Sequence, residues 1–565
     1  MTIAAKSDQQ ARLSNDVLIA LAILFVAGAF ILAAMLRRPD MTANRDYLFL
    51  DPGTNLLLAE RLSEGARLYR DLGYSYGPLA IHPYRIWADV FGNTALSFSA
   101  FLGFFSAINI VLAYAVMRTL VSRRTATVVV FAGLLTTILT PGSIAYGYQS
   151  SAYSVFERTF FLIVLAIWMP PAQRTTKRAV ALGVTLGLWQ LLRFGTALFV
   201  GLAIVIVDVI ALLVMRSSRA DIERWLRRSL ATLACFLSVE GAWIAFAFAT
   251  LPASDALDAI WPSFVLEGFT VWPEYLRWPQ LISLKHFAAQ QLTTVVSALF
   301  AIFGCLLVIR RVHASRSAIT PAVDPASAVR DFRLVIPFVF YAVGCIALFR
   351  AASHFNQYAW LLPLAAALLI ERFDWRVGAA FALLTLPTLA LNVRINFLNP
   401  PSNEVDRVVL PDGSALALSP PMAHRVRMLR EYAMSDGGRS LFIVPTGAGF
   451  HAILDVPQPT RQSWLIPGFF RAGDEEAVLR ILATKPSAIV LAEHPASETP
   501  GSDPCTWFEW RHFSTTFCPR LARQLAMSQM IRVDDGAWII PSVADSVQAA
   551  KRAAAAAPVS APRTP

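Results

Sequence analysis

The sequence predicts a polytopic α-helical membrane protein of about eleven transmembrane helices, followed by a C-terminal α/β soluble domain. Two observations lead to this fold class. Hydrophobic residues make up 56% of the 565 residues and charged residues only 15%, against roughly a quarter in soluble domains. The apolar residues also come in blocks close to the ~20 residues that a helix needs to cross the hydrocarbon core of a bilayer. A soluble chain of this length would instead form several domains with polar surfaces.

The apolar blocks can be placed one by one. They cover residues 15–36, 95–117, 125–143, 153–170, 179–193, 196–215, 229–250, 288–309, 334–349, 356–371 and 376–392. Polar break points, Arg193-Phe194-Gly195 and Arg350 to Gln357, divide the two closest pairs of blocks and predict turns at the membrane surface. The first block has a longer apolar core than a signal peptide, and Arg37-Arg38 follow it, which indicates an uncleaved anchor.

Basic residues in the short connections predict the orientation. They collect between Arg118 and Arg124, between Arg174 and Arg178, and between Arg216 and Arg228, so these connections and the N-terminus are expected in the cytoplasm. An odd number of helices then places the C-terminal domain outside, in the periplasm of a bacterial inner membrane. The net charge of +11 is therefore a topology signal and does not indicate a nucleic-acid partner.

The domain boundaries follow the change in hydropathy. We expect a transmembrane module at 1–392 with a first periplasmic loop at 37–94, a periplasmic α/β domain at 393–548, and a disordered Ala/Pro-rich tail at 549–565. In the α/β domain the pattern predicts strands at 440–445, 488–491 and 537–540, and an amphipathic helix at 474–484.

Two of the five cysteines, Cys505 and Cys518, lie in the predicted outside domain. An oxidising compartment permits a disulfide between them, with two separate free thiols as the alternative.

The first loop carries the most informative pattern. Leu56 to Gly65 predicts a short amphipathic helix on the membrane surface, between turns at Pro52-Gly53 and Gly77-Pro78. These turns would fold Asp51 and Asp71 back toward the first pair of helices. A carboxylate there would meet a substrate at the lipid–water boundary, whereas the alternative is that both are ordinary solvated charges.

The order of motifs in this loop is similar to that of a known enzyme superfamily. The motifs are Asp51-Pro52-Gly53, a short Ala/Leu helix that ends in glycine, Leu68-Tyr69-Arg70-Asp71, Tyr76-Gly77-Pro78 and Phe91-Gly92. Weaker echoes follow at Gly183 to Gly195, Phe349 to His354, and Pro459 to Phe469. This pattern resembles the GT-C glycosyltransferases, especially bacterial members related to protein O-mannosyltransferases and lipid A aminoarabinose transferases.

The resemblance implies transfer of a sugar from a polyprenyl-phosphate carrier on the outer face of the membrane. The first-loop acidic pair of the superfamily is usually Asp-Glu. In this sequence Pro52 stands at the second position, so only Asp51 carries over, and Asp46 or Asp71 is left to compensate.

The chemistry of such a transfer needs two kinds of side chain. A carboxylate takes the proton of the acceptor hydroxyl, and cations stabilise the charge that develops on the departing phosphate. Asp51 is the candidate base and Asp71 the second candidate. The candidate phosphate ligands stand at the outer ends of predicted helices: Arg193, Arg350, His354 and Lys285. The alternative for the arginines is that they snorkel to the interface.

The sequence thus predicts an inverting membrane glycosyltransferase that acts on a glycan, lipid or protein acceptor. It shows no cluster with metal-ligand spacing, and it leaves open whether a divalent cation assists. The aromatic loop 251–287 is either an interfacial belt or a lid over the substrate. The rival interpretations are a transporter or flippase of lipid-linked glycans, and a polysaccharide polymerase or ligase.

Overall fold

A computed structural model describes part of the chain. The described residues are 15–29, 32, 51–74, 76–119, 121–130, 152–169, 175–193, 195–214, 218–260, 376, 406–410, 415–418, 420–434, 441–444, 448–458, 461, 480, 489–492, 531–534 and 537–539.

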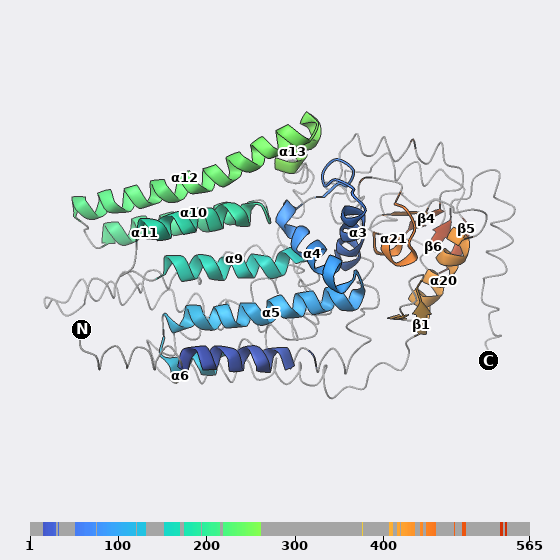
Figure 1. Ribbon diagram of the computed structural model, residues 1–565, viewed down its shortest axis with the longest axis horizontal. Coiled ribbons are helices and arrows are strands. Elements are labelled where there is room, and N and C mark those ends of the chain that lie inside the picture. Colours follow the sequence, from blue (N-terminus) through green and yellow to red (C-terminus); the bar gives the residue numbers. More distant parts are fainter. Residues whose placement is uncertain are drawn as a thin grey trace, which may run out of the picture.

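Long helices run side by side and form a bundle (Figure 1). The described helices of this bundle are Asn15–Ala29, α5 (Ala95–Arg118), α6 (Arg123–Val129), α9 (Ala152–Trp168), α10 (Thr176–Gln190), α11 (Thr196–Val214) and α12 (Arg219–Thr250). Two of them, α5 and α12, are long and apolar enough to cross a membrane by length and composition. The bundle agrees with the predicted polytopic helical architecture, although the number of spans stays a prediction.

The predicted break at 193–195 is confirmed, because α10 ends at Gln190 and α11 begins at Thr196. The predicted block at 229–250 is part of a longer helix that begins at Arg219. Ser218 and Asp221 form a capping box at this end, in which each side chain bonds the backbone of the other residue. With this cap, α12 begins with a polar segment, residues 219–228, that hydropathy alone does not include. Apart from Arg376, the four blocks between 288 and 392 lie outside the described residues.

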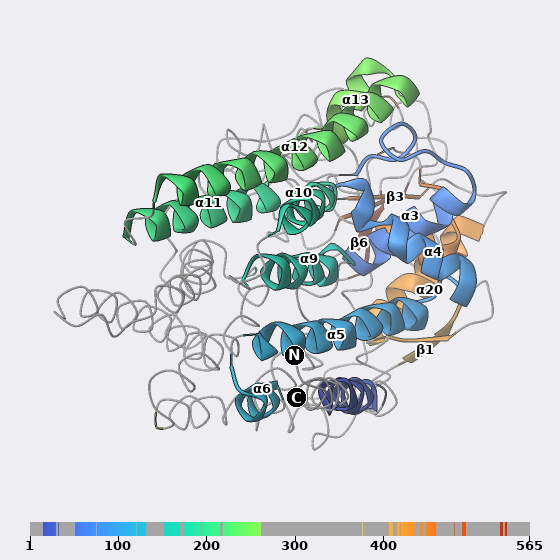
Figure 2. The same ribbon diagram turned by 60° about the vertical axis from the view of Figure 1, so that its left-hand side comes forward.

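The bundle has a basic end and a first-loop end. At the basic end Arg118 and Arg123 both donate to Oδ1 of Asp16, at 3.1 and 2.8 Å, which ties the N-terminal helix to α5 and α6. The starts of α10 and α12 lie at this end too. The first loop and the C-terminal elements lie at the other end, in both views of the molecule (Figures 1 and 2). The arginine-rich helix ends thus lie together at one end of the bundle, as we predicted for the connections on the cytoplasmic side.

Glycines let α10 and α12 approach closely. A Cβ atom at Gly183 would overlap the carbonyl oxygen of Thr232, and one at Gly187 would lie 2.7 Å from Cβ of Val239. Small residues four apart are typical of helix contacts in membranes, because they allow the backbones to pack directly. The hydroxyl of Thr232 adds a hydrogen bond of 3.0 Å to the carbonyl of Ala179.

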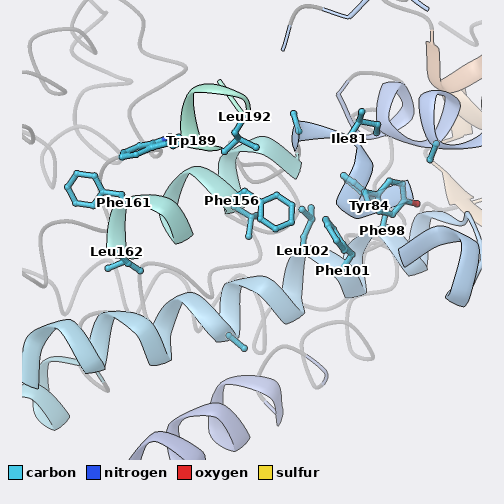
Figure 3. Packing of buried hydrophobic residues seen from close by; sticks show 14 of the residues in the cluster. Ile81, Tyr84, Phe98, Phe101, Leu102, Phe156, Phe161, Leu162, Trp189 and Leu192 are labelled. Atoms are coloured by element: carbon cyan, nitrogen blue, oxygen red, sulfur yellow. The ribbon is translucent and has the colours of Figure 1, made fainter. Parts of the chain in front are cut away.

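Aromatic rings join α4 (His82–Phe91), α5 and α9 on the other side of the bundle. Tyr84 lies edge-on to Phe101 at 5.3 Å, and Phe101 meets Phe156 at 5.7 Å (Figure 3). Buried Asn109 of α5 donates to the carbonyl of Val155 at 2.9 Å, so a polar contact fixes the register of α5 against α9. The first-loop helices are therefore anchored on the bundle through a packed core.

The first loop folds into helices α3 (Asp51–Ser63), η2 (Pro78–Ala80) and α4 (His82–Phe91). The predicted helix at Leu56 to Gly65 is present, but it is not an amphipathic surface helix. Leu56, Leu57 and Leu58 are all at least 96% buried, because α4 covers one side of α3 and α21 (Ala448–Leu454) another. The turn expected at Pro52-Gly53 is instead the first turn of α3, where proline loses no helical hydrogen bond.

The C-terminal elements contain short strands and helices. They are β1 (Asp406–Val409), β2 (Ala415–Leu418), α20 (Pro420–Met434), β3 (Leu441–Val444), α21, β4 (Ile489–Ala492), β5 (Ile531–Asp534) and β6 (Ala537–Ile539). The predicted strands β3 and β4 pair in parallel, and the predicted strand β6 pairs antiparallel with β5. The hairpin β1–β2 and helix α20 were not predicted. Cys505 and Cys518, the helix predicted at 474–484 (apart from Arg480) and the tail at 549–565 lie outside the described residues.

We predict that Gly183→Ala destabilises the protein by about 1–3 kcal/mol, since α10 and α12 must separate to admit a methyl group. Thermal unfolding in detergent measures this effect. Gly241→Ala on α12 is the matched control: a Cβ atom there meets nothing within 4 Å, and alanine favours a helix over glycine. Equal unfolding temperatures for the two variants would contradict the close approach.

Candidate active site

Tyr69 holds the first loop in an unusual backbone conformation. Its φ is +67°, a left-handed value that is costly for a residue with a large side chain. Three contacts maintain it: the amide donates to the carbonyl of Leu72 at 2.7 Å, the hydroxyl donates to the carbonyl of Tyr76 at 2.7 Å, and the ring meets Trp243 of α12 edge-on at 6.2 Å. The motif Leu68-Tyr69-Arg70-Asp71 therefore forms a tight, buried turn with Asp71 at its surface.

The same loop is docked on the end of α10 through backbone hydrogen bonds. The amide of Gly77 donates to the carbonyl of Leu192 at 3.2 Å, and the amide of Leu79 donates to the carbonyl of Leu191 at 3.2 Å. A Cβ atom at Gly77 would overlap the carbonyl oxygen of Leu191. The predicted Gly77-Pro78 turn is thus present, and only glycine fits this close approach.

Arg461 joins three distant segments at this end of the bundle. Its guanidinium donates to Oδ1 of Asp255 at 2.9 Å and to Oδ2 of Asp258 at 3.0 Å, both on α13 (Ala253–Ile260). It also donates to the carbonyl of Tyr69 at 2.9 Å, while its own carbonyl accepts from the amide of Gly73 at 2.8 Å. We call these five residues the Arg461 network. It fixes both sides of the turn that carries Asp71.

Arg193 lies directly after α10, beside the docked loop. Its Nη1 donates to Oε2 of Glu157 on α9 at 2.8 Å, and the two side chains are 23% and 9% exposed. A bond between a guanidinium and a carboxylate orients both groups when little water reaches them. The pair therefore presents an oriented cation next to Leu192, the residue whose carbonyl accepts from the amide of Gly77.

The two candidate bases have different positions. Asp51 is the first residue of α3, the end of a helix that favours negative charge. Asp71 is half exposed and accepts from the amide of Arg67 at 2.9 Å, with Arg70 at 3.8 Å. Asp71 and Arg193 therefore lie on segments that contact each other.

The remaining predicted ligands, Lys285, Arg350 and His354, lie outside the described residues, as does most of the aromatic loop 251–287.

Sequence reasoning missed Glu157, Asp255 and Asp258. Glu157 stands inside an apolar block, and an ionisable residue in such a block signals a functional or structural partner. The aspartates are three residues apart on a short helix, a spacing that places both carboxylates on one face. Arg461 was noticed only as part of a motif, and its partners are 203 to 392 residues away in the sequence.

Among the described residues no group of three or more His, Cys, Asp or Glu side chains is placed to hold a metal ion. Asp255 and Asp258 are the closest approach to such a group, and Arg461 already bonds both.

Glu60 lies where α3 packs against α21. Burial, followed by the neighbouring Asp455 and Glu64 carboxylates, raises the pKa of Glu60 to about 7 from the ordinary 4.5. The folded state therefore takes up a proton at this interface at a pH where the unfolded chain does not.

A scan against protein-family models and a search of curated proteins find no match to this chain. Solved structures similar to it include the oligosaccharyltransferase of Archaeoglobus fulgidus with Zn and sulfate, at TM-score 0.46 and 14% identity, covering 86% of this chain and 70% of that one. Archaeal oligosaccharyltransferase AglB from the same organism, with an inhibitory peptide and a dolichol-phosphate, has TM-score 0.41 and 14% identity, with 77% and 63% covered.

A third similar structure is ArnT from Cupriavidus metallidurans bound to undecaprenyl phosphate, at TM-score 0.36 and 12% identity, covering 79% of this chain and 85% of that one.

We predict that Arg461→Lys loosens the first loop, because one ammonium group cannot reach two carboxylates and a carbonyl in the way that a guanidinium does. The guanidinium loses a charge-assisted hydrogen bond, so the loop opens more often. Hydrogen exchange at the Gly73 amide should therefore become about tenfold faster or more. Arg427→Lys is the matched control, since Arg427 makes an exposed pair with Asp406 at 3.1 Å. Unchanged exchange at Gly73 would contradict the bracing role.

We also predict that acidification stabilises the contact of α3 with α21. The folded state binds more protons than the unfolded state between about pH 4.5 and pH 7, so stability falls as the pH rises through this window. Glu60→Gln should flatten the dependence of the unfolding temperature on pH. Glu223→Gln, at an exposed position on α12 that does not contribute to the pKa of Glu60, is the control. If the unfolding temperature of Glu60→Gln still depends steeply on pH, groups other than Glu60 cause this dependence.

Proposed function

We propose that this chain is an integral membrane glycosyltransferase. It transfers a sugar from a polyprenyl-phosphate donor to an acceptor hydroxyl on a glycan, lipid or protein, with inversion at the anomeric carbon. The observation that carries the proposal is the docking of the first loop, which carries Asp51 and Asp71, on the end of α10, beside the Arg193–Glu157 pair. A carboxylate and a cation at one end of a membrane bundle are the two groups that this transfer requires.

The first step is proton removal. Asp51, with Asp71 as the second candidate, accepts the proton of the acceptor hydroxyl. The hydroxyl oxygen then forms a bond to the anomeric carbon through an oxocarbenium-like state, while the bond to the phosphate oxygen breaks. The carrier leaves as the polyprenyl phosphate, and the negative charge stays on its phosphate oxygens.

The second requirement is charge stabilisation at the leaving phosphate. Arg193 supplies a guanidinium that Glu157 holds in one orientation, so little reorganisation is needed when charge develops. Arg350, His354 and Lys285 remain proposed as further ligands on the basis of their sequence positions. Whether a divalent cation also neutralises the phosphate is decided by adding a chelator to the assay.

A rigid first loop supports this function. The left-handed Tyr69, the glycine contact at residue 77 and the Arg461 network hold the loop from three sides. Catalytic groups must be held in place to lower an activation barrier. Under this proposal the first-loop end faces the periplasm of a bacterial inner membrane, and the basic end with the N-terminus faces the cytoplasm.

We predict that Asp51→Asn lowers turnover by about 10²–10⁴-fold, because the amide cannot accept the proton. The measurement is sugar transfer or donor hydrolysis by purified protein in nanodiscs with polyprenyl-phosphate sugars. Asp406→Asn, on an exposed strand away from the first loop, should leave turnover unchanged.

Full activity of Asp51→Asn would remove this residue as the base. A wild-type protein that moves lipid-linked glycan across vesicles without breaking the sugar–phosphate bond would instead establish the transporter interpretation.

A further inference from the structure

A pocket of about 330 Å³ lies between α9, α10, α11 and α12. It extends from the level of Arg178 and Asp208, near the basic end, to the level of Leu186 and Ala197. None of the five residues of the Arg461 network lines it. The proposed transfer reaction uses none of its residues.

The inner part of the pocket is an apolar shaft. The side chains that line it include Leu182, Leu186, Leu202, Val205, Leu233 and Phe236. Gly201 of α11 leaves the shaft open, since a Cβ atom there would have Cδ1 of Leu186 as its nearest neighbour, at 3.7 Å. A hydrocarbon chain fits such a lining because it has no polar atoms to satisfy.

The mouth of the pocket is polar and basic. Arg178 and Arg228 line it with Thr175 and Ser229, and Asp208 is the one carboxylate among the lining residues that the structure describes. Two guanidiniums against one carboxylate leave an excess of positive charge.

More basic residues surround this mouth on the same helix ends. Lys177 stands beside Arg178, and Arg227 stands beside Arg228, while Arg224 bonds Asp221 at 2.6 Å. Trp225 also lines the pocket, and tryptophan favours the level of lipid headgroups.

We propose that this pocket binds an anionic phospholipid of the leaflet at the basic end. The phosphate lies at Arg178 and Arg228, and one acyl chain enters the shaft. Basic pockets between transmembrane helices recognise lipid phosphates in this way. A zwitterionic lipid would place its own ammonium group against the arginines, so it fits the mouth less well. The bound lipid would hold α11 against α10 and α12.

The purified full-length protein in mild detergent is mixed with one of three probes: phosphatidylglycerol, phosphatidylethanolamine or a polyprenyl phosphate. Native mass spectrometry then measures how much of each lipid stays bound. We expect selective retention of phosphatidylglycerol. Arg178→Gln and Arg228→Gln should each lower this retention by about fivefold. Arg219→Gln is the matched control: Arg219 is the first residue of the same helix, its side chain is 94% exposed and pairs with Glu223 outside the pocket, and the variant should retain the lipid.

A second pair of variants tests the shaft without changing charge. Gly201→Leu fills the space beside Leu186 and should abolish retention while the unfolding temperature is kept, whereas Gly241→Leu, at a position with nothing within 4 Å, should retain the lipid. Equal retention of the two phospholipids, or retention unaffected by Gly201→Leu, would overturn the proposal. Preferred retention of the polyprenyl phosphate would also overturn it, in favour of a carrier site.

Discussion

One partly buried guanidinium, that of Arg461, organises the first-loop end of this protein because it must be paired. Arg461 is 20% exposed, and its carboxylate partners Asp255 and Asp258 are 16% and 12% exposed. A charge that loses most of its water must be paired and hydrogen-bonded, because an isolated one costs several kcal/mol. The only way to satisfy Arg461 is to bring α13, the first loop and the C-terminal segment to one point. The strained turn at Tyr69 is stable because this point is fixed.

A second constraint comes from backbone contacts that exclude side chains. Gly77 on the first loop and Gly183 on α10 both lie against carbonyl oxygens, of Leu191 and Thr232. The first contact sets the height of the loop on the bundle, and the second sets the distance between α10 and α12. Together they connect the geometry around Arg193 to the packing of the membrane helices. A change in the helix contact would therefore be transmitted to the candidate site.

Charge divides the bundle into two functional ends. At one end Arg193, Glu157 and the Arg461 network form short ion pairs, which orient groups for chemistry. At the other end Asp16 bonds Arg118 and Arg123, next to helix starts rich in arginine. Under the two proposals, the first arrangement serves the transfer reaction and the second binds an anionic lipid of the leaflet. The pocket among α9 to α12 belongs to the second arrangement.

The sequence by itself predicted the described helices of the bundle, the break between α10 and α11, and three of the strands, and it singled out the first loop as the candidate site. Hydropathy and turn residues are local properties, so they can be read without a fold. The β1–β2 hairpin was not predicted because its strands have only four residues each, too few for a clear period. The sequence did not predict the tight turn of the Tyr69 motif either, because contacts with the distant residues Trp243 and Arg461 offset its backbone strain.

Only the tertiary structure decided which charges meet. The sequence singled out Arg193, but Glu157 becomes its partner through the packing of α9 on α10. Leu56 to Leu58 look like the apolar face of a surface helix until α21, almost 400 residues away, covers them. The physical reason is the same in each case: local patterns encode how a segment folds, whereas desolvated charges and buried apolar faces find partners through contacts of long sequence separation.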